Sequence, residues 1–272
     1  MTSIQSPPAR RASFDCALVT QASCRATSAE IATWRKSPDP SGRIAVHPSL
    51  LRHADEQTVA GVAAVFKAIL GVGLDPEDFR HWAVLAAPRY FGRAAFERAF
   101  PTFQAEGAWG VSPHLIPAHS LHSPSGTLSQ ALKAQGPNLG IGGTPASVRE
   151  SLLVASTWLM TGTVEGVWVV MTGRDLESDG REPAGAYEAL ALALTPALAG
   201  HVGPRLRVSP DEVAPLGLAD AAGLDLARWL APGTLRADAP IPSGAIPSPH
   251  FRAGRPAREI DRNRDPEAHD EG

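Results

Sequence analysis

Short apolar runs alternate with longer, helix-like patterns over the first two thirds of the chain. The segments Phe14–Thr20, Ala83–Ala87 and Val167–Met171 are apolar through their middle, which is typical of strands buried on both faces of a sheet. The segment Asp55–Leu70 has the period of a helix and ends at a glycine pair. This alternation predicts an α/β fold with a largely parallel sheet. The apolar stripe of that helix consists of Val59, Val62, Ala63, Phe66, Ile69 and Leu70.

Further elements are expected between and after these. Pro101 is expected to end a Phe-rich helix, because proline lacks the amide donor that a helix interior needs. Tyr187–Leu194 fits a strand or a helix by its period, and its place after the Val167 strand favours a strand. Helices are also predicted at Ser28–Trp34, Phe91–Phe100, Gly126–Ala134 and Pro145–Met160, and a short buried strand at Asn138–Ile141.

Composition divides the chain into four parts. Residues 1–12 are predicted to be a flexible arm, residues 13–200 a single folded domain, and residues 201–231 a small helical extension. From residue 232 to 272 the sequence is first rich in proline and then densely charged, which predicts disorder.

Charge and cysteine content narrow the possible classes of function. With 43% hydrophobic residues and a formal net charge of -3 over 272 residues, the chain has enough apolar residues for a sizeable core and no basic stripe for nucleic acid. Cys16 and Cys24 form neither a zinc motif nor a disulfide framework. No apolar run is long enough for a signal peptide or a membrane span. We therefore expect a cytoplasmic protein that binds neither nucleic acid nor membrane.

The stretch from Gly136 to Arg174 is where the chemistry is expected. It predicts a strand, a glycine-rich elbow and a helix, because Gly142 and Gly143 permit a sharp turn, Thr144 can cap a helix, and Pro145 suits the first helical turn. An elbow between a strand and a helix often presents a reactive residue at the edge of a sheet. Here the presented residue is a proline.

This stretch resembles the β-ketoacyl synthases of the thiolase superfamily. Gly136-Pro137-Asn138 matches the family's glycine-proline-asparagine segment, and Ala146-Ser147 matches the end of its Thr-Ala-Cys-Ala-Ser elbow. The resemblance covers roughly residues 14–196 and is greatest to short, cysteine-less ketosynthase N-terminal-like proteins. It implies a thiolase-like half: a five-stranded, mostly parallel sheet with helices on both faces. It also implies that the helix beginning at Pro145 is the most buried helix.

Two departures from the family pattern concern catalysis. Pro145 stands where the family has its nucleophilic cysteine, and a proline cannot carry an acyl group. The family's second half, with its histidine pair and lysine, has no counterpart. The resemblance thus implies a catalytically inactive accessory or scaffold protein of a fatty-acid or polyketide-type synthase, without cofactor or metal, partnered by a ketosynthase or an acyl carrier protein. Its candidate pocket consists of Gly143, Thr144, Pro145, Ser147 and His119.

The resemblance also predicts an interface. In the family, the strand before the elbow pairs with its twin across a two-fold axis. Leu139, Gly140 and Ile141 are therefore the candidate dimer edge, in a homodimer or a heterodimer.

Other interpretations remain open. Pro145 is explained equally well as a fold element that survives without function. A cryptic acyltransferase or thioester hydrolase could use Ser147 or the loop His114–His122, although Ser147 lacks a GxSxG context and its family counterpart is structural. The three histidines of that loop could bind a metal, but their spacing and the nearby prolines favour a pocket-lining loop. A non-enzymatic homodimeric module is a third interpretation.

Two further groups of residues are candidates for ligand or partner contacts: those after the second strand and the tryptophans. Arg89, Tyr90 and Arg93 could face an acyl carrier's phosphopantetheine arm or form a solvated loop, and the loop is favoured. The six tryptophans are expected mostly in the core.

Overall fold

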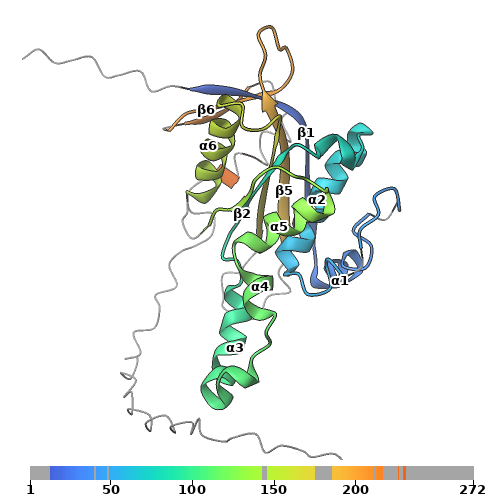
Figure 1. Cartoon of the computed structure of the whole chain (residues 1–272), viewed down its shortest axis with the longest axis vertical. Helices are drawn as coiled ribbons and strands as arrows, with labels where there is room; N and C mark the ends of the chain where they lie inside the picture. The colour runs from blue at the N-terminus through green and yellow to red at the C-terminus, as the bar shows by residue number, and fades with distance from the viewer. Residues whose placement is uncertain are drawn as a thin grey trace, which may run out of the picture. The chain divides into compact units, whose positions relative to one another are not determined.

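A single mixed sheet forms the centre of the protein (Figure 1). The computed structural model describes residues 13–39, 41–47, 49–142, 146–174, 186–210, 212–216, 226 and 229–230. Within these residues the sheet has seven strands in the order β3-β2-β4-β5-β1-β6-β7. The strands are β1 (Phe14–Ala26), β2 (Ala83–Pro88), β3 (Asn138–Gly140), β4 (Val167–Arg174), β5 (Tyr187–Pro196), β6 (Arg205–Val208) and β7 (Val213–Leu216).

Strand directions explain how the expected sheet relates to the observed one. β3, β2 and β4 are parallel to one another, and β5 is antiparallel to both β4 and β1. The first five strands thus form the predicted mostly parallel sheet, in which β5 alone runs the other way. The prediction of five strands in total was wrong, because β6 and β7 extend the sheet beyond β1 as an antiparallel pair.

The two additional strands fall in the segment predicted to be a small helical extension. Each strand is only four residues long, and β7 contains Pro215, so the local pattern is too short to indicate a strand. Among the described residues of this segment, only Leu226, Trp229 and Leu230 are helical. Residues 201–231 were predicted to be helical, but the structure has strands at Arg205–Val208 and Val213–Leu216 instead.

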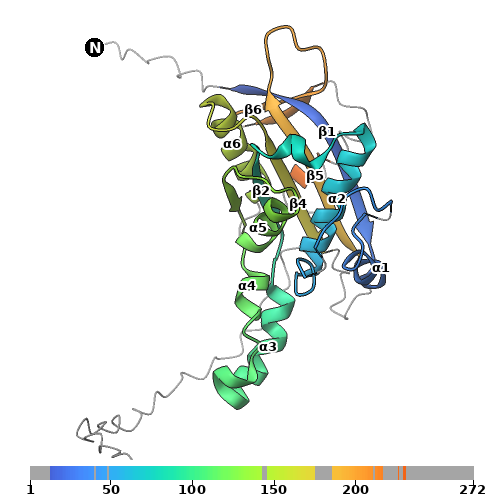
Figure 2. The same ribbon diagram turned by 45° about the vertical axis from the view of Figure 1, so that its right-hand side comes forward.

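Helices cover both faces of the sheet, as expected (Figure 2). On one face, α2 (Glu56–Val72) and α5 (His122–Ala131) pack on alternate strand residues such as Val170. On the other face, α6 (Ser147–Met160) packs on the intervening residues, including Val169. Alternation of side chains along each strand therefore supplies two separate cores.

The most buried helix is α2, and not the helix after the elbow as predicted. Twelve of the 17 residues of α2 are buried, whereas seven of the 14 residues of α6 are. Small residues let α2 approach the sheet closely: a Cβ atom at Gly61 would lie 3.2 Å from Cγ1 of Val170. In contrast, α6 packs against the sheet on one side only and leaves Arg149 and Thr157 exposed.

The segment between β2 and α5 also departs from expectation. Helix α3 (Arg93–Glu106) continues through Pro101, which was predicted to end it. The predicted loop His114–His122 contains a short helix, α4 (Leu115–His119). These helices extend away from the sheet (Figure 1). The remaining helices are α1 (Ser28–Trp34), η1 (Pro76–Phe79) and η2 (Gly107–Gly110).

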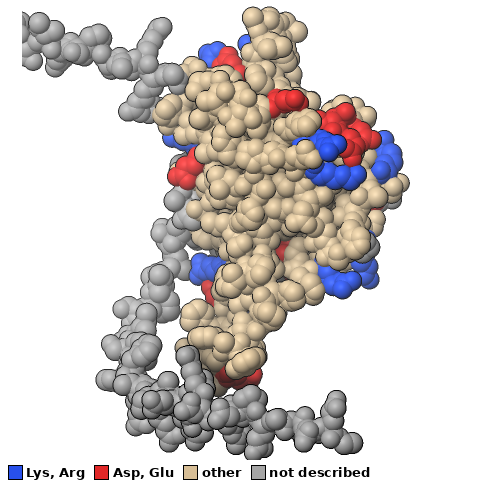
Figure 3. All heavy atoms as spheres, in the orientation of Figure 1, with Lys and Arg blue, Asp and Glu red and all other residues tan. Residues whose placement is uncertain are grey.

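The distribution of surface charge and the character of the helices concern two expected classes of partner, nucleic acid and membrane. On the face drawn in Figure 3, uncharged side chains dominate, and Lys and Arg lie close to Asp and Glu rather than in one basic stripe. Of the helices that the structure describes, none combines the length and the apolar character that a bilayer crossing requires.

Candidate functional site

The carboxyl ends of the parallel strands β2, β3 and β4 lie at the same end of the sheet, and ligands commonly bind at this end in α/β folds. Gly143, Thr144 and Pro145 of the expected pocket lie outside the described residues. Ser147 is described: it is the first residue of α6 and is 2% exposed. Its carbonyl oxygen accepts a 2.7 Å hydrogen bond from the Ser151 hydroxyl. Within the described residues, no histidine or carboxylate hydrogen-bonds to the hydroxyl of Ser147.

A histidine–carboxylate pair lies at the start of α2. The Nδ1 atom of His119 is 2.9 Å from Oδ2 of Asp55, and the two side chains are 17% and 10% exposed. Asp55 is also the N-cap of α2, where Oδ1 accepts a 2.8 Å hydrogen bond from the Gln57 amide. Because the carboxylate holds one ring nitrogen, it fixes the orientation of the imidazole. An imidazole held in this way can transfer protons as a general acid or base.

A buried amide connects the start of α2 to the ends of two strands. The Thr172 hydroxyl in β4 donates to Oε1 of Gln57 at 3.0 Å, and Nε2 of Gln57 donates to the Arg89 carbonyl at 3.1 Å. Gln57 is 5% exposed and Thr172 is 1% exposed. Both polar atoms of the amide thus have partners, which holds the Asp55–His119 pair in a fixed position relative to the sheet edge.

Trp229, from the C-terminal part of the described chain, covers the carboxyl ends of β2 and β4. The guanidinium carbon of Arg89 lies 4.5 Å from the ring centroid of Trp229, and the guanidinium donates to the Trp229 carbonyl. A Cβ atom at Gly173 would lie 3.3 Å from Cη2 of this tryptophan. Trp229 is only 7% exposed. Arg89 is therefore engaged within the protein, in contrast to the solvated loop that was favoured for it.

The other residues of that loop are more exposed. Tyr90 is 46% exposed and has a φ of 52°, a left-handed conformation that is rare for a tyrosine. Arg93 forms an exposed ion pair with Glu97 one helical turn later. The tryptophans are mostly buried or half-buried as predicted, but Trp109 is 99% exposed.

The candidate dimer edge lies at the edge of the sheet. Among the described strands, β3 pairs only with β2, and Leu139 is 41% exposed. The glycines around it are held under the start of α5: a Cβ atom at Gly140 would overlap the carbonyl of Leu121, and one at Gly142 would lie 2.6 Å from Cδ2 of Leu121. Ile141 packs against the core beneath α6. Pairing of this edge with another chain stays a prediction.

The three histidines of the segment His114–His122 point to different neighbours. His114 stacks on His53 with ring centroids 4.6 Å apart and ring planes 1° from parallel. His119 contacts Asp55, and the ring of His122 lies over Gly126. No three His, Cys, Asp or Glu side chains of the described residues gather as metal ligands.

The two cysteines do not supply a thiolate. Both lie in β1, and burial raises the pKa of each thiol to about 12. A thiol with such a pKa is protonated at neutral pH, so neither Cys16 nor Cys24 offers a thiolate.

Sequence reasoning named His119 as a candidate but named neither Asp55, with which it pairs, nor Gln57 and Thr172. Asp55 carried a usable signal, because an aspartate immediately before an apolar helical stripe is a typical N-cap. Gln57 and Thr172 carried no local signal, since their pairing joins residues 115 positions apart.

Comparisons with known proteins give similarity in fold. No family model matches the chain, and no curated protein matches its sequence. One similar structure is a type II polyketide synthase acyl carrier protein in complex with its ketosynthase: 15% identity, TM-score 0.49, covering 67% of this chain and 62% of that one. A ketosynthase in complex with its chain length factor from Xenorhabdus doucetiae has 15% identity and TM-score 0.48, with 68% and 81% covered.

A third similar structure is a β-ketoacyl synthase from Burkholderia phymatum, with 14% identity, TM-score 0.49, and 71% and 63% covered. The chain spans less than two thirds of the length of the first and third of these chains. At these identities the likeness concerns the fold alone, over about two thirds of this chain.

Proposed function

We propose that this protein is a catalytically inactive, ketosynthase-like accessory or scaffold protein in fatty-acid or polyketide-type acyl chain synthesis. The observation that carries the proposal is the proline at position 145, in a segment whose Gly136-Pro137-Asn138 and Ala146-Ser147 match the family pattern. Covalent acyl transfer of the ketosynthase kind needs a thiolate at that position. The two cysteines lie in β1 and are protonated, which supports the absence of such a group.

The partner that we propose is a ketosynthase or an acyl carrier protein, bound through the β3 edge. An edge strand leaves its outer amide and carbonyl groups available for pairing with another chain. Leu139 on this strand is a large apolar residue with 41% exposure, which supports an interface at this place. In this role the protein contributes shape to an acyl pocket or a docking surface rather than a nucleophile.

Purification of the tagged protein from its own cells, with mass spectrometry of the bound proteins, tests this proposal. We expect a ketosynthase or an acyl carrier protein to co-purify, and Leu139→Arg to abolish this association. Val202→Arg is the matched control, because Val202 is 98% exposed and lies between β5 and β6, away from β3. Equal recovery of the partner with both variants would contradict the β3 interface. Recovery of the protein alone, as a dimer, would instead support a non-enzymatic homodimeric module.

A second candidate function is favoured by one observation, the Asp55–His119 pair. A carboxylate-held imidazole supports a cryptic acyltransferase or thioester hydrolase in which His119 activates a water or hydroxyl group. The Ser147 hydroxyl, the other notable group, has no hydrogen bond to this histidine. His119, with a water molecule as the nucleophile, is therefore the stronger candidate of the two.

Hydrolysis of an acyl thioester of N-acetylcysteamine separates the two candidates. If the protein is a hydrolase, His119→Ala lowers the rate by about 100-fold, the range usual for loss of a general base. His81→Ala is the control, because His81 is exposed and lies outside the Asp55–His119 pair. Absence of turnover in the unaltered protein, or an unchanged rate in His119→Ala, removes this function. Loss of the rate in Ser147→Ala would reassign the nucleophile to Ser147.

A further inference from the structure

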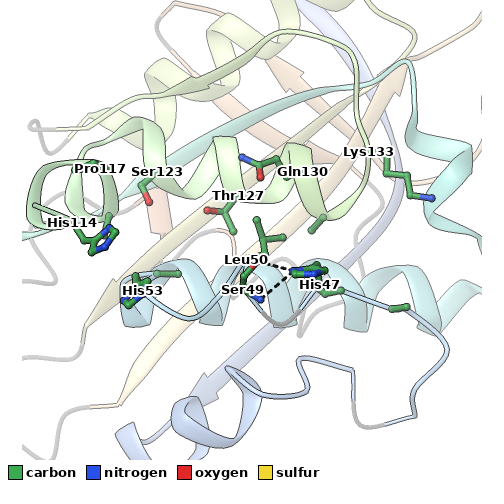
Figure 4. A pocket seen from close by; sticks show the side chains of 15 residues that line it. His47, Ser49, Leu50, His53, His114, Pro117, Ser123, Thr127, Gln130 and Lys133 are labelled. Carbon is green, nitrogen blue, oxygen red and sulfur yellow. Dashed lines mark hydrogen bonds between the residues drawn. The ribbon is translucent and has the colours of Figure 1, made fainter. Parts of the chain in front are cut away.

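A cavity of about 620 Å³ lies between α5 and residues 45–47 and 49–54, which precede α2 (Figure 4). Its volume is within the range of small-molecule sites in proteins. Ala54 and Ala118 line its end, next to Asp55 and His119, but those two side chains are not part of its wall. The accessory function proposed above does not use this cavity.

One wall is a polar face of α5. Ser123, Thr127 and Gln130 line the cavity and are spaced four and three residues apart, so they share one side of the helix. The opposite side of α5 is buried and includes Leu128. The polar wall therefore carries two hydroxyls and an amide, none of which brings a charge.

The facing wall contributes His47 and Ser49. The backbone amide of Ser49 donates to Nδ1 of His47 at 3.3 Å, and the Ser49 hydroxyl lies 2.6 Å from the same atom. Because a backbone amide can only donate, Nδ1 acts as an acceptor, and the ring proton of a neutral His47 resides on Nε2. His47 can therefore offer an N–H donor to a ligand in the cavity.

The stacked pair His53 and His114 closes one end. The two rings are parallel within 1° at a centroid distance of 4.6 Å. The lone pairs of an imidazole lie in the plane of its ring, so two stacked rings cannot both direct a lone pair at one metal ion. Their N–H groups, in contrast, can each donate to a different oxygen of one multi-oxygen anion.

A lysine lies at the other end. Lys133 lines the cavity and has a φ of 52°, at a position after a helix where glycine or asparagine is usual. Residues that keep an unfavourable backbone conformation are concentrated at functional sites. Its ammonium group forms a 2.8 Å ion pair with Glu77, which is not part of the wall.

We propose that this cavity binds a small organic ligand that carries an oxyanion, either a phosphate or a carboxylate. Among the described residues that line it, there is no Asp or Glu, whereas there are three histidines and a lysine. N–H and O–H donors with no carboxylate among them favour an anion. The ammonium of Lys133 is held by Glu77 outside the wall and is not counted among these donors. Leu50, Val46 and Pro117 supply apolar surface for the organic part of the ligand.

Isothermal titration calorimetry of the full chain, with pyrophosphate and citrate as separate probes, tests the proposal and distinguishes the two oxyanions. We expect at least one probe to bind at low ionic strength and to bind more weakly as salt is added. The double variant His53→Gln/His114→Gln is expected to lose at least tenfold in affinity. His81→Gln is the matched control, because this histidine is exposed and does not line the cavity.

A second variant guards against loss of folding in the double variant. Thr127→Glu places a carboxylate in the polar wall of α5, on the side away from the core, and is expected to abolish binding of both probes. NMR of the imidazole protons gives a further readout, because the probe should shift the resonances of His53 and His114 but not those of His81. Binding of neither probe, equal binding by Thr127→Glu and the unaltered protein, or zinc binding in preference to both anions would overturn the proposal.

Discussion

The imidazole of His119 and the carboxylate of Asp55 meet at 2.9 Å across 64 residues of sequence. The same carboxylate caps helix α2 through its other oxygen, which accepts a hydrogen bond from the Gln57 amide. One side chain thus stabilises the most buried helix of the fold and orients the candidate histidine. Its two roles can be separated by substitution.

Asparagine and alanine at position 55 should have different effects on stability. Asparagine caps helices about as well as aspartate, whereas alanine removes the cap at a cost of about 1 kcal/mol. We therefore expect Asp55→Ala to lower the free energy of unfolding by about 1 kcal/mol or more and Asp55→Asn to lower it less, measured by urea denaturation. Asp75→Ala is the control, because Asp75 caps only the four-residue η1. Equal losses in both Asp55 variants would show that the carboxylate's contact with His119, rather than the cap, sets the stability.

The buried amide of Gln57 should be costly to remove alone. Gln57→Leu leaves the buried Thr172 hydroxyl without its acceptor, and an unsatisfied buried group costs about 1–3 kcal/mol. Adding Thr172→Val removes this orphaned group. We expect the double variant to be more stable than the sum of the single losses predicts, in a double-mutant cycle measured by chemical denaturation. Strict additivity would contradict the hydrogen bond between these side chains.

Two glycines should respond in opposite directions to alanine. A Cβ atom at Gly140 would overlap the Leu121 carbonyl, so Gly140→Ala is expected to lower the melting temperature strongly or to prevent folding. Gly71 lies in α2 with nothing within 4 Å of an added Cβ, and Gly71→Ala should stabilise by about 0.5–1 kcal/mol. Thermal unfolding of both variants checks this contrast. A Gly140→Ala protein with an unchanged melting temperature would refute the close packing of α5 on β3.

The pairing of β6 with β1 should depend on acid. Arg207 donates to both oxygens of Asp15 at 2.8 and 2.9 Å, and its hydrogen bond and charge lower the pKa of that carboxyl below its ordinary value despite the opposing effect of burial. The stabilisation is therefore complete above the unfolded-state pKa, about 3.9, and is lost as pH falls through the lower folded-state pKa. We expect Asp15→Asn to destabilise at pH 7 by at most about 1 kcal/mol, because the pair is partly exposed. The difference from the unaltered protein should shrink as pH falls below the unfolded-state pKa, in urea titrations.

Restoring a cysteine at the elbow should not restore chemistry. Pro145→Cys supplies a thiol at the family's nucleophile position but neither the histidine pair nor the lysine. We expect no transfer of an acyl group from a model thioester by this variant alone. Acyl transfer by Pro145→Cys without a partner would contradict the account of the protein as an inactive scaffold.

The regular core was predictable from sequence because its signals are local. The apolar runs at β2 and β4 and the stripe of α2 found those elements within two or three residues at each end. Helix α1 has the predicted bounds, which agrees with its capping box of Thr27 and Glu30. Strand β1 extends six residues further than predicted. Its second half alternates polar and apolar residues, which is a strand pattern that the prediction overlooked.

The remaining features depend on distant contacts that no local pattern carries. Helix α3 continues through Pro101 although a proline normally ends a helix. In the candidate site, the pattern identified His119 but could not place it next to Asp55, since the two are joined only by the packing of α4 near the start of α2. The cavity beside α5 likewise combines histidines from two separate segments.

The position of β1 in the sheet means that this strand is made long before the strands with which it pairs. Within the part of the chain that the structure describes, β1 pairs only with β5 and β6, and its partners in β5 are 161 to 180 residues later in the chain. At about 5–20 residues per second, a ribosome needs roughly 10–40 s to reach them after β1 has been made. For that time β1 has no strand to pair with, and the apolar half of β1 is open to wrong partners. We expect this delay to make the nascent chain depend on chaperones more than its regular α/β core would suggest.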